Sequence, residues 1–314
     1  MSESIHFHQH DPGREWIKDR RIAMEAEAPT HAITPNVIRL PNGRYRMYYT
    51  ALDYGPQAFV DSTARILSAI SEDGFDWNRE PGARLEVFEP EAALRVLCPD
   101  VIPLATGGYR MYFEASYAAD RGCRILSATS PDGVTFEPDP GVRVGDDEHA
   151  CGSPRCIHVE DDAQSGTPSY RLYFHYHPFP PQRGLDAGNQ ICSAHSFDGL
   201  HFEPDQGTRV NQQGEQQFGT VYAPEVIRLG NGSYRMYYAG WSDEPTHGRI
   251  FTALSTDGIT WQRDAEPCLE FGGDYEDIKV SEPCVIDMPD GSFRLYYEAC
   301  GTDLQWRILS ARSA

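Results

Sequence analysis

Residues 222–241 read YAPEVIRLGNGSYRMYYAGW, and close copies of this stretch occur at four other places in the 314-residue chain. Each copy opens with a short phrase around a proline: TPNVI from Thr34, CPDVI from Cys98, SPRCI from Ser153, APEVI from Ala223 and EPCVI from Glu282. These prolines, at positions 35, 99, 154, 224 and 283, are spaced 55 to 70 residues apart. A repeat of this length is typical of a fold built from similar units.

Each copy predicts four strands. A short apolar run such as Val226-Ile227 precedes, in four of the copies, a turn that contains glycine, and then comes Tyr-Arg-Met-Tyr-Tyr or a near copy. The alternation of side-chain types in this aromatic run is typical of a half-buried strand. A third run, RIFTALS from Arg249 in this copy, leads in four copies through an Asp-Gly turn to an aromatic residue. Four antiparallel strands, five times and without helical periodicity, predict an all-β fold, a five-bladed β-propeller.

The N-terminal segment is predicted to complete the last blade. Too few residues remain after Pro283 for a full unit, whereas HDPGREW from His10 resembles SEDGFDW from Ser71. We therefore expect residues 10–30 to be the outer strand of the last blade, which closes the ring and removes a free sheet edge. The chain is then one domain, residues 1–314, with blades that begin near residues 34, 98, 153, 223 and 282.

Composition limits the classes of partner. With a net charge of −20, the chain is a poor match for nucleic acid or an anionic membrane, which attract basic surfaces. We find no signal peptide and no run near the about 20 apolar residues of a membrane helix, so the expected location is cytoplasmic. The eight cysteines form no CxxC pair and are expected to be free thiols. Neither a cofactor nor a metal site is predicted, and His6, His8 and His10 are interpreted as a solvated chain end.

The residues that vary around the prolines are candidates for the functional site. In a propeller the first strand of each blade lines the central channel, and the residues before and after each proline should share one face of an extended strand. The residues before the prolines are Thr34, Cys98, Ser153, Ala223 and Glu282, and those after them are Asn36, Asp100, Arg155, Glu225 and Cys284. We predict Asp100, Glu225 and Glu282 as catalytic carboxylates, with Asn36 and Arg155 as binding residues.

A second group of candidates lies near the ends of the second strands. These predicted substrate-binding residues are Asp53, Glu114, His175, His177, Trp241 and Glu298, together with Tyr222 from a first strand. The aromatic rings are suited to stacking on a sugar. The segments 148–152, 178–189 and 211–220 are expected to form the rim of the funnel and to set specificity.

Convergent carboxylates are the groups that glycosidic cleavage requires. One protonates the leaving oxygen, and another activates water or attacks the sugar. The alternative is that Asp100, Glu225 and Arg155 form a buried ion-pair network that only fills the channel. If Arg155 forms an anion site with His175 and His177, phosphate would replace water as the acceptor.

The repeated motifs carry a family resemblance. Pro-x-Val-Ile, Gly-x-Tyr-Arg-Met-Tyr-Tyr and Ser-x-Asp-Gly-x-x-Trp resemble the five-bladed propellers of the arabinanase, levansucrase and invertase superfamily, which includes glycoside hydrolase families 43, 32 and 130. The resemblance spans residues 10–314. It implies that Glu282, in SEPCVI, is the general acid, because family 43 carries a glutamate just before a later proline.

Other positions match the families in part. Ala-Pro-Glu-Val at Glu225 is similar to the Ala-Pro-Asp-Val phrase of family 43, whose acidic residue has a supporting role. Cys-Pro-Asp at Asp100 resembles a family 32 phrase, with Leu97 in the place of its acid, and Ser-Pro-Arg at Arg155 resembles a family 130 phrase. Thr34 stands where family 43 carries its general base.

The sequence thus predicts a glycoside-cleaving enzyme, a hydrolase or phosphorylase, that acts on a small carbohydrate or glycoside. Two other classes stay open. One is a lyase, isomerase or cyclase that uses His175 or His177 as acid or base. The other is a non-catalytic carbohydrate-binding propeller, although a multivalent lectin would tend to repeat its mouth residues. The expected partner is a carbohydrate or another small molecule, and the oligomeric state is left open.

Overall fold

The computed structural model describes residues 10–55, 58–146, 149–160, 168–178, 189–212, 220–243 and 246–314. Its regular elements in these ranges are β-strands. They are β1 (Trp16–Met24), β2 (Thr30–Arg39), β3 (Tyr45–Gly55), β4 (Ala58–Ser71), β5 (Asn78–Arg79), β6 (Arg95–Pro103), β7 (Tyr109–Ser116), β8 (Arg124–Ser130), β9 (Glu137–Pro138), β10 (His149–Glu160), β11 (Pro168–Pro178), β12 (Gln190–Ser196), β13 (Glu203–Pro204), β14 (Thr220–Arg228), β15 (Tyr234–Asp243), β16 (Thr246–Ser255), β17 (Gln262–Arg263), β18 (Lys279–Asp287), β19 (Phe293–Cys300) and β20 (Trp306–Ser313). No helix among the described residues is long and apolar enough to span a membrane.

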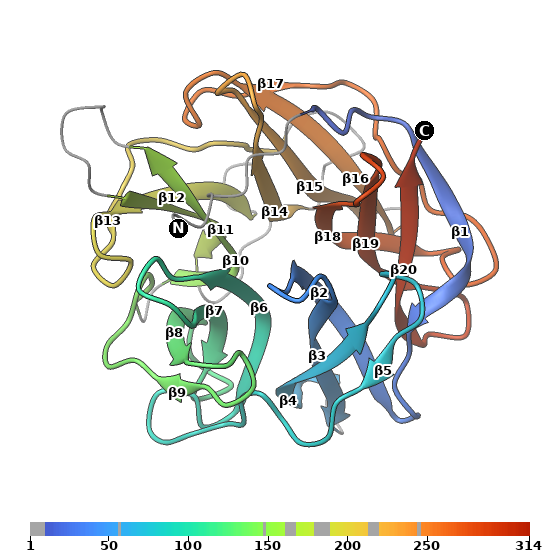
Figure 1. Cartoon of the computed structure of the whole chain (residues 1–314). Helices are drawn as coiled ribbons and strands as arrows, with labels where there is room; N and C mark the ends of the chain where they lie inside the picture. The colour runs from blue at the N-terminus through green and yellow to red at the C-terminus, as the bar shows by residue number, and fades with distance from the viewer. Residues whose placement is uncertain are drawn as a thin grey trace.

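The strands pair in consecutive antiparallel groups. These units are β2–β5, β6–β9, β10–β13, β14–β17, and β18–β20 with β1 on its outer side, and we call them the first to fifth units. Single parallel bridges, Ala64 to Arg95 and Gly248 to Lys279, join the first unit to the second and the fourth to the fifth. Figure 1 shows the units around a common centre, with β2, β6, β10, β14 and β18 nearest to it. Each of these inner strands contacts the next, and β18 contacts β2.

A tyrosine in the second strand of each unit reaches a glycine turn of the next unit. The hydroxyl groups donate to glycine carbonyl oxygens: Tyr48 to Gly133 (2.8 Å), Tyr112 to Gly199 (2.8 Å), Tyr173 to Gly258 (2.9 Å), Tyr237 to Gly13 (2.7 Å) and Tyr296 to Gly74 (2.6 Å). Gly13 lies in the N-terminal segment, so this segment supplies the turn that the fifth unit needs. The repeated tyrosines and turns therefore hold neighbouring units together.

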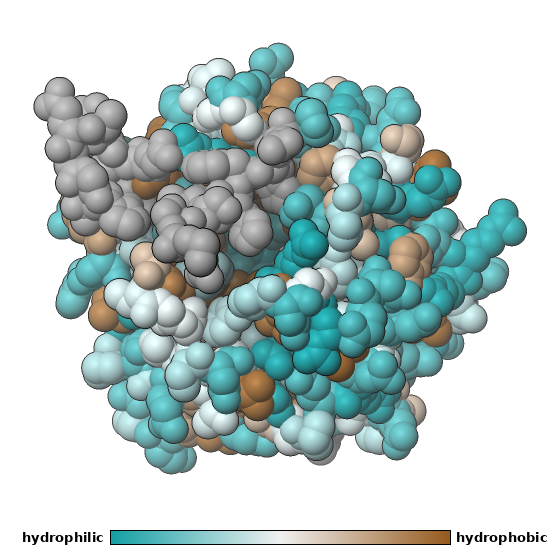
Figure 2. Space-filling model, in the orientation of Figure 1, coloured by the Kyte–Doolittle hydropathy of each residue, from teal (hydrophilic) through white to brown (hydrophobic). Residues whose placement is uncertain are grey.

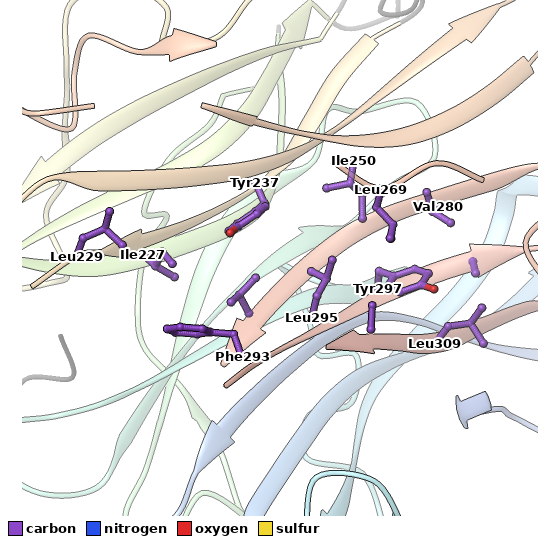
Figure 3. Packing of buried hydrophobic residues seen from close by; sticks show 13 residues of the cluster. Ile227, Leu229, Tyr237, Ile250, Leu269, Val280, Phe293, Leu295, Tyr297 and Leu309 are labelled. Atoms are coloured by element: carbon purple, nitrogen blue, oxygen red, sulfur yellow. The ribbon is translucent and has the colours of Figure 1, made fainter. Parts of the chain in front are cut away.

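Apolar side chains fill the space between neighbouring units. Figure 3 shows one such cluster, in which Ile227 and Tyr237 of the fourth unit pack with Leu295 and Tyr297 of the fifth. A similar cluster joins the first unit to the fifth through Tyr49 and neighbouring residues. The face of the molecule in Figure 2 is mostly hydrophilic, with apolar residues scattered over it, as the large negative charge leads one to expect.

We expect the N-terminal contact to contribute measurably to stability. Tyr237→Phe removes the hydrogen bond to the Gly13 carbonyl and should lower the free energy of unfolding by about 1 kcal/mol. Tyr45→Phe is the matched control, because the buried Tyr45 hydroxyl has no hydrogen-bond partner among the described residues. Urea unfolding at neutral pH measures both variants. Equal stability of the two would show that the contact with the N-terminal segment adds nothing.

Candidate active site

The inner strands are not regularly extended where they pass the prolines. The residue before each proline has a left-handed backbone: φ is 52° at Thr34, 53° at Cys98, 44° at Ser153, 52° at Ala223 and 48° at Glu282. The pairing register of each inner strand shifts at this place. Because such a bulge breaks the alternation of faces, the expectation that the residues before and after the proline share one face was wrong. The two positions instead form two separate groups of side chains.

The residues after the prolines form a hydrogen-bonded ring between units, which we call the inner ring (Asn36, Asp100, Arg155, Glu225 and Cys284). Asn36 accepts from the Val101 amide (3.0 Å), and Asp100 accepts from the Cys156 amide (2.7 Å). Glu225 accepts from the Val285 amide (2.9 Å), and the Cys284 sulfur accepts from the Val37 amide (3.2 Å). Each of these contacts reaches an inner strand of another unit, so the ring ties the units together at the centre.

Arg155 compensates the charge of the inner ring. Its Nε donates to Glu225 Oε2 at 2.8 Å, and its two Nη atoms donate to the carbonyl oxygens of Pro35, Pro99 and Pro154. Burial raises the pKa of Asp100 to about 6 and that of Glu225 to about 7, and the guanidinium charge opposes both shifts. The hydrogen bonds of the predicted catalytic residues Asp100 and Glu225 thus favour the ion-pair network that the sequence left as the alternative.

Three glutamates lie together in a second group, which we call the glutamate cluster (Glu114, Glu282 and Glu298). Ser153 joins two of them, because its Oγ donates to Glu282 Oε1 (2.9 Å) and its amide donates to Glu114 Oε2 (3.3 Å). Glu298 accepts from Ser281 Oγ at 2.7 Å. All three side chains are buried. The structure therefore brings the predicted catalytic Glu282 together with two residues that the sequence assigned to substrate binding.

Glu282 is the member of the cluster with a free oxygen. Its Oε2 is buried and has no hydrogen-bond partner among the described residues. Burial raises the pKa of Glu282 to about 8, the negative charge of Glu298 adds to this effect, and Arg155 and Ser153 oppose it. Burial and the neighbouring negative charge therefore favour the protonated form of this carboxyl group. A buried, protonated carboxyl with an unused oxygen is a ready proton donor.

The predicted histidines and aromatic residues lie beside the cluster. The ring centroids of His175 and His177 are 6.2 Å apart, and those of Tyr222 and Trp241 are 6.4 Å apart. A Cβ atom at Gly152 would lie 1.9 Å from Glu114 Oε2 and 2.7 Å from His175 Cε1, so these two side chains meet over this glycine. Burial lowers the pKa of His175 to about 3, which keeps its imidazole neutral, and its Nδ1 has no described partner.

Lys279 and Trp306 belong to this site and were missed from the sequence. The Lys279 ammonium lies 4.5 Å from the ring centroid of Trp241, 4.7 Å from that of Trp306 and 5.2 Å from that of Tyr222. The sequence analysis considered the residues directly beside the prolines, and Lys279 lies three positions before Glu282. A signal was present, since the equivalent positions before Thr34 and Cys98 hold the basic residues His31 and Arg95.

The remaining predicted residues lie away from the glutamate cluster or outside the described residues. Asp53 accepts hydrogen bonds from Thr30 and from Arg65 Nη1 (3.1 Å), so its carboxylate is paired at the end of β3. The predicted rim segments include residues 148, 179–188 and 213–219, and His6 and His8 also lie outside the described ranges. All eight cysteines are free. The described part of the chain contains no group of side chains arranged to hold a metal ion.

Comparisons with solved structures place this geometry in a known fold. A glycosyl hydrolase from Bacteroides ovatus matches with a TM-score of 0.75 and 15% identity, over 95% of this chain and 93% of that chain. The two chains share a β-propeller fold. No family model and no curated protein matches the sequence.

Two further structures share the β-propeller fold. One comes from the family 130 mannoside phosphorylases, described as containing glycoside hydrolases that target β-1,2 mannosidic linkages in Candida mannan. It has a TM-score of 0.74 and 16% identity, over 94% of this chain and 93% of that chain. The other, a thermostable family 43 glycoside hydrolase, has a TM-score of 0.68 and 17% identity, over 93% and 92%. At these identities the likeness concerns the fold.

Proposed function

We propose that this chain is a glycoside hydrolase built on a five-bladed propeller, which the N-terminal segment closes. The blade count is supported by the five units, by their five tyrosine contacts and by the contact of β18 with β2. Pairing of β1 with β20 supports the closure. The expected substrate is a small carbohydrate or glycoside, and the expected location is the cytoplasm.

The single observation that carries the proposal is the state of Glu282. Burial and the charge of Glu298 favour the protonated form of its carboxyl group, and its Oε2 has no described partner, at the centre of a fold shared with glycoside hydrolases. The neighbouring Glu298 accepts hydrogen bonds from Ser281 and from the Thr34 amide, which favour its ionised form. Burial also raises the pKa of Glu298, but Lys279, Ser281 and the Thr34 amide oppose this rise, so Glu282 is the one that keeps its proton more readily. Acid and base catalysis of glycoside cleavage requires two carboxyl groups whose protonation states differ in this way.

The reaction then assigns a role to each carboxyl. Glu282 Oε2–H donates its proton to the glycosidic oxygen while the bond from that oxygen to the anomeric carbon breaks. Ionised Glu298 takes a proton from the water molecule that forms the new bond to the anomeric carbon. Tyr222, Trp241 and His175 line the neighbouring surface and would contact the sugar, through ring faces and through the unpartnered Nδ1 of His175.

Water rather than phosphate is the proposed acceptor. The anion site considered from the sequence combined Arg155 with His175 and His177, but every nitrogen of the Arg155 guanidinium already donates to Glu225 or to a carbonyl oxygen. His175 is neutral at pH 7, because burial lowers its pKa to about 3. Neither residue therefore offers a positive charge to a phosphate ion.

Wild-type protein should release free sugar from aryl glycosides or short oligosaccharides in phosphate-free buffer, at a rate that added phosphate leaves unchanged. Chromatography of the products separates free sugar from sugar phosphate. Formation of a glycosyl phosphate would contradict the choice of acceptor. Folded protein with no turnover across a broad panel of linkages, but with sugar binding in calorimetry, would replace the hydrolase with a carbohydrate-binding propeller.

A further inference from the structure

Lys279 occupies an aromatic box beside the glutamate cluster. Three rings from three strands surround its ammonium: Tyr222 of β14, Trp241 of β15 and Trp306 of β20, at 4.5 to 5.2 Å. The residue is buried, with 8% of its surface exposed. The faces of aromatic rings attract a cation, and the attraction grows when the cation is desolvated. The box therefore fixes a positive charge at one place in the site.

Lys279 and Glu298 share one face of a two-strand ladder. Lys279 pairs with Cys300, and Ser281 pairs with Glu298, in the antiparallel pairing of β18 with β19. Since alternate residues of a strand share a face, Lys279 and Glu298 are diagonal neighbours, a separation that a lysine side chain can span. Glu282, in contrast, follows Ser281 at the bulge where the register shifts, and its carboxyl group accepts a hydrogen bond from Ser153 of another unit.

We propose that Lys279 is a positioning residue that keeps Glu298 ionised beside a protonated Glu282. The proposal deepens the proposed hydrolase function, on which its catalytic meaning rests. Without a nearby cation, two buried glutamates next to each other would both favour the neutral form. A cation that lies closer to one glutamate than to the other lowers the pKa of the closer one more strongly. The closer glutamate can then act as the base, and the other is left as the acid.

Other groups around Glu298 do not replace this charge. The groups that face it are Lys279 and Glu282 of β18, the Thr34 amide of β2, Tyr54 of β3, Cys98 of β6, Tyr222 of β14 and Cys300 of its own strand. Lys279 is the one cation in this described set, and its charge lowers the pKa of Glu298 against the effect of burial. Arg155 faces Glu282 instead, but its guanidinium is bonded to Glu225.

The test follows the two carboxyl groups directly and needs no substrate. Protein labelled with ¹³C at the glutamate side-chain carboxyl is titrated by NMR, and the signals are assigned with Glu282→Gln and Glu298→Gln. In the wild type, Glu298 should ionise at a lower pH than Glu282. In Lys279→Met the acid dissociation constant of Glu298 should fall by about tenfold or more, which is one pKa unit. Lys279→Gln should shift the titration of Glu298 in the same way, because both variants lose the positive charge although their side chains pack differently.

Two variants separate charge from other effects. Lys279→Arg keeps the charge and should leave the titration of Glu298 close to that of the wild type. Lys18→Met removes the other lysine of the chain, which bonds to Glu276 (2.7 Å) on the outer side of the fifth unit, and should not move either titration. An unchanged Glu298 titration in both Lys279→Met and Lys279→Gln would overturn the proposal, whether or not the protein cleaves glycosides. If Glu298 shifts as expected but no glycoside is cleaved, Lys279 keeps its assigned effect and the hydrolase function fails.

Discussion

Replacement of Glu282 by Gln should lower kcat/KM for glycoside cleavage by about 10²- to 10⁴-fold, the range that general acid catalysis provides. The amide cannot give up a proton to the leaving oxygen. The loss should be smaller for an aryl glycoside with a good leaving group, because that group departs without protonation. The wild-type kcat/KM should fall as the pH rises through about 8, where Glu282 ionises, and the variant should lack this limb.

A matched control is Glu276→Gln. Glu276 is another buried glutamate near the fifth unit, and it bonds to Lys18 and to the Tyr297 hydroxyl (3.0 Å) rather than to the cluster. Its replacement should leave the rate and the leaving-group dependence unchanged. Equal losses in both variants would mean that general damage to the fold, and not a lost proton donor, lowers the rate.

The same variant should change how stability depends on pH. The pKa of Glu282 rises from an ordinary value of 4.5 to about 8 on folding, so the folded state binds the proton more tightly. Its contribution is fully present below about pH 4.5 and is lost as the pH rises through about 8. Relative to Glu282→Gln, the wild type should therefore lose unfolding free energy across this window, which denaturant unfolding at a series of pH values measures.

Arg155→Met should destabilise the protein by about 3–5 kcal/mol, the cost of leaving buried charge without its partner. The change removes the ion pair with Glu225 (2.8 Å) and the positive charge that Asp100 also faces. Methionine keeps most of the side-chain volume, so the loss reports on charge and hydrogen bonds rather than on a cavity. Urea unfolding with circular dichroism measures the change.

The half-exposed pair of Arg65 with Asp53 (3.1 Å) provides the comparison. Because solvent screens this pair, Arg65→Met should cost no more than about 1 kcal/mol. Addition of Glu225→Gln to Arg155→Met should restore part of the lost stability, since it removes one of the charges left unpaired. If Arg155→Met costs as little as Arg65→Met, the inner ring does not hold the units together in the way described above.

The repeat made much of the fold predictable, down to single residues. The aligned prolines indicated the inner strands, and the likeness of HDPGREW to SEDGFDW pointed to Gly13, whose carbonyl accepts from Tyr237 as Gly74 accepts from Tyr296. These features depend on local pattern and on repetition, which a single sequence contains. The residues that vary beside the prolines included Glu282 among three candidate carboxylates, and the resemblance to family 43 implied its role as the acid.

The division of the site into two groups could not be predicted in this way. It depends on the left-handed residue before each proline, whose bulge separates Glu282 from Asp100 and Glu225. Threonine, cysteine, serine, alanine and glutamate occupy this position, and none of them signals positive φ as glycine would. Lys279 was missed for a related reason, since its aromatic box combines Tyr222 and Trp241 of the fourth unit with Trp306 of the fifth, and sequence alone does not show that these rings meet.

The most direct test of the account compares hydrolysis by the wild type, Glu282→Gln and Glu225→Gln in phosphate-free buffer, with each protein shown to be folded. The account predicts that Glu282→Gln loses cleavage of unactivated glycosides and that Glu225→Gln keeps most of its activity while losing stability. The opposite pattern, in which Glu225→Gln is folded but inactive and Glu282→Gln is active, would place the chemistry in the inner ring and contradict the assignment of the proton donor.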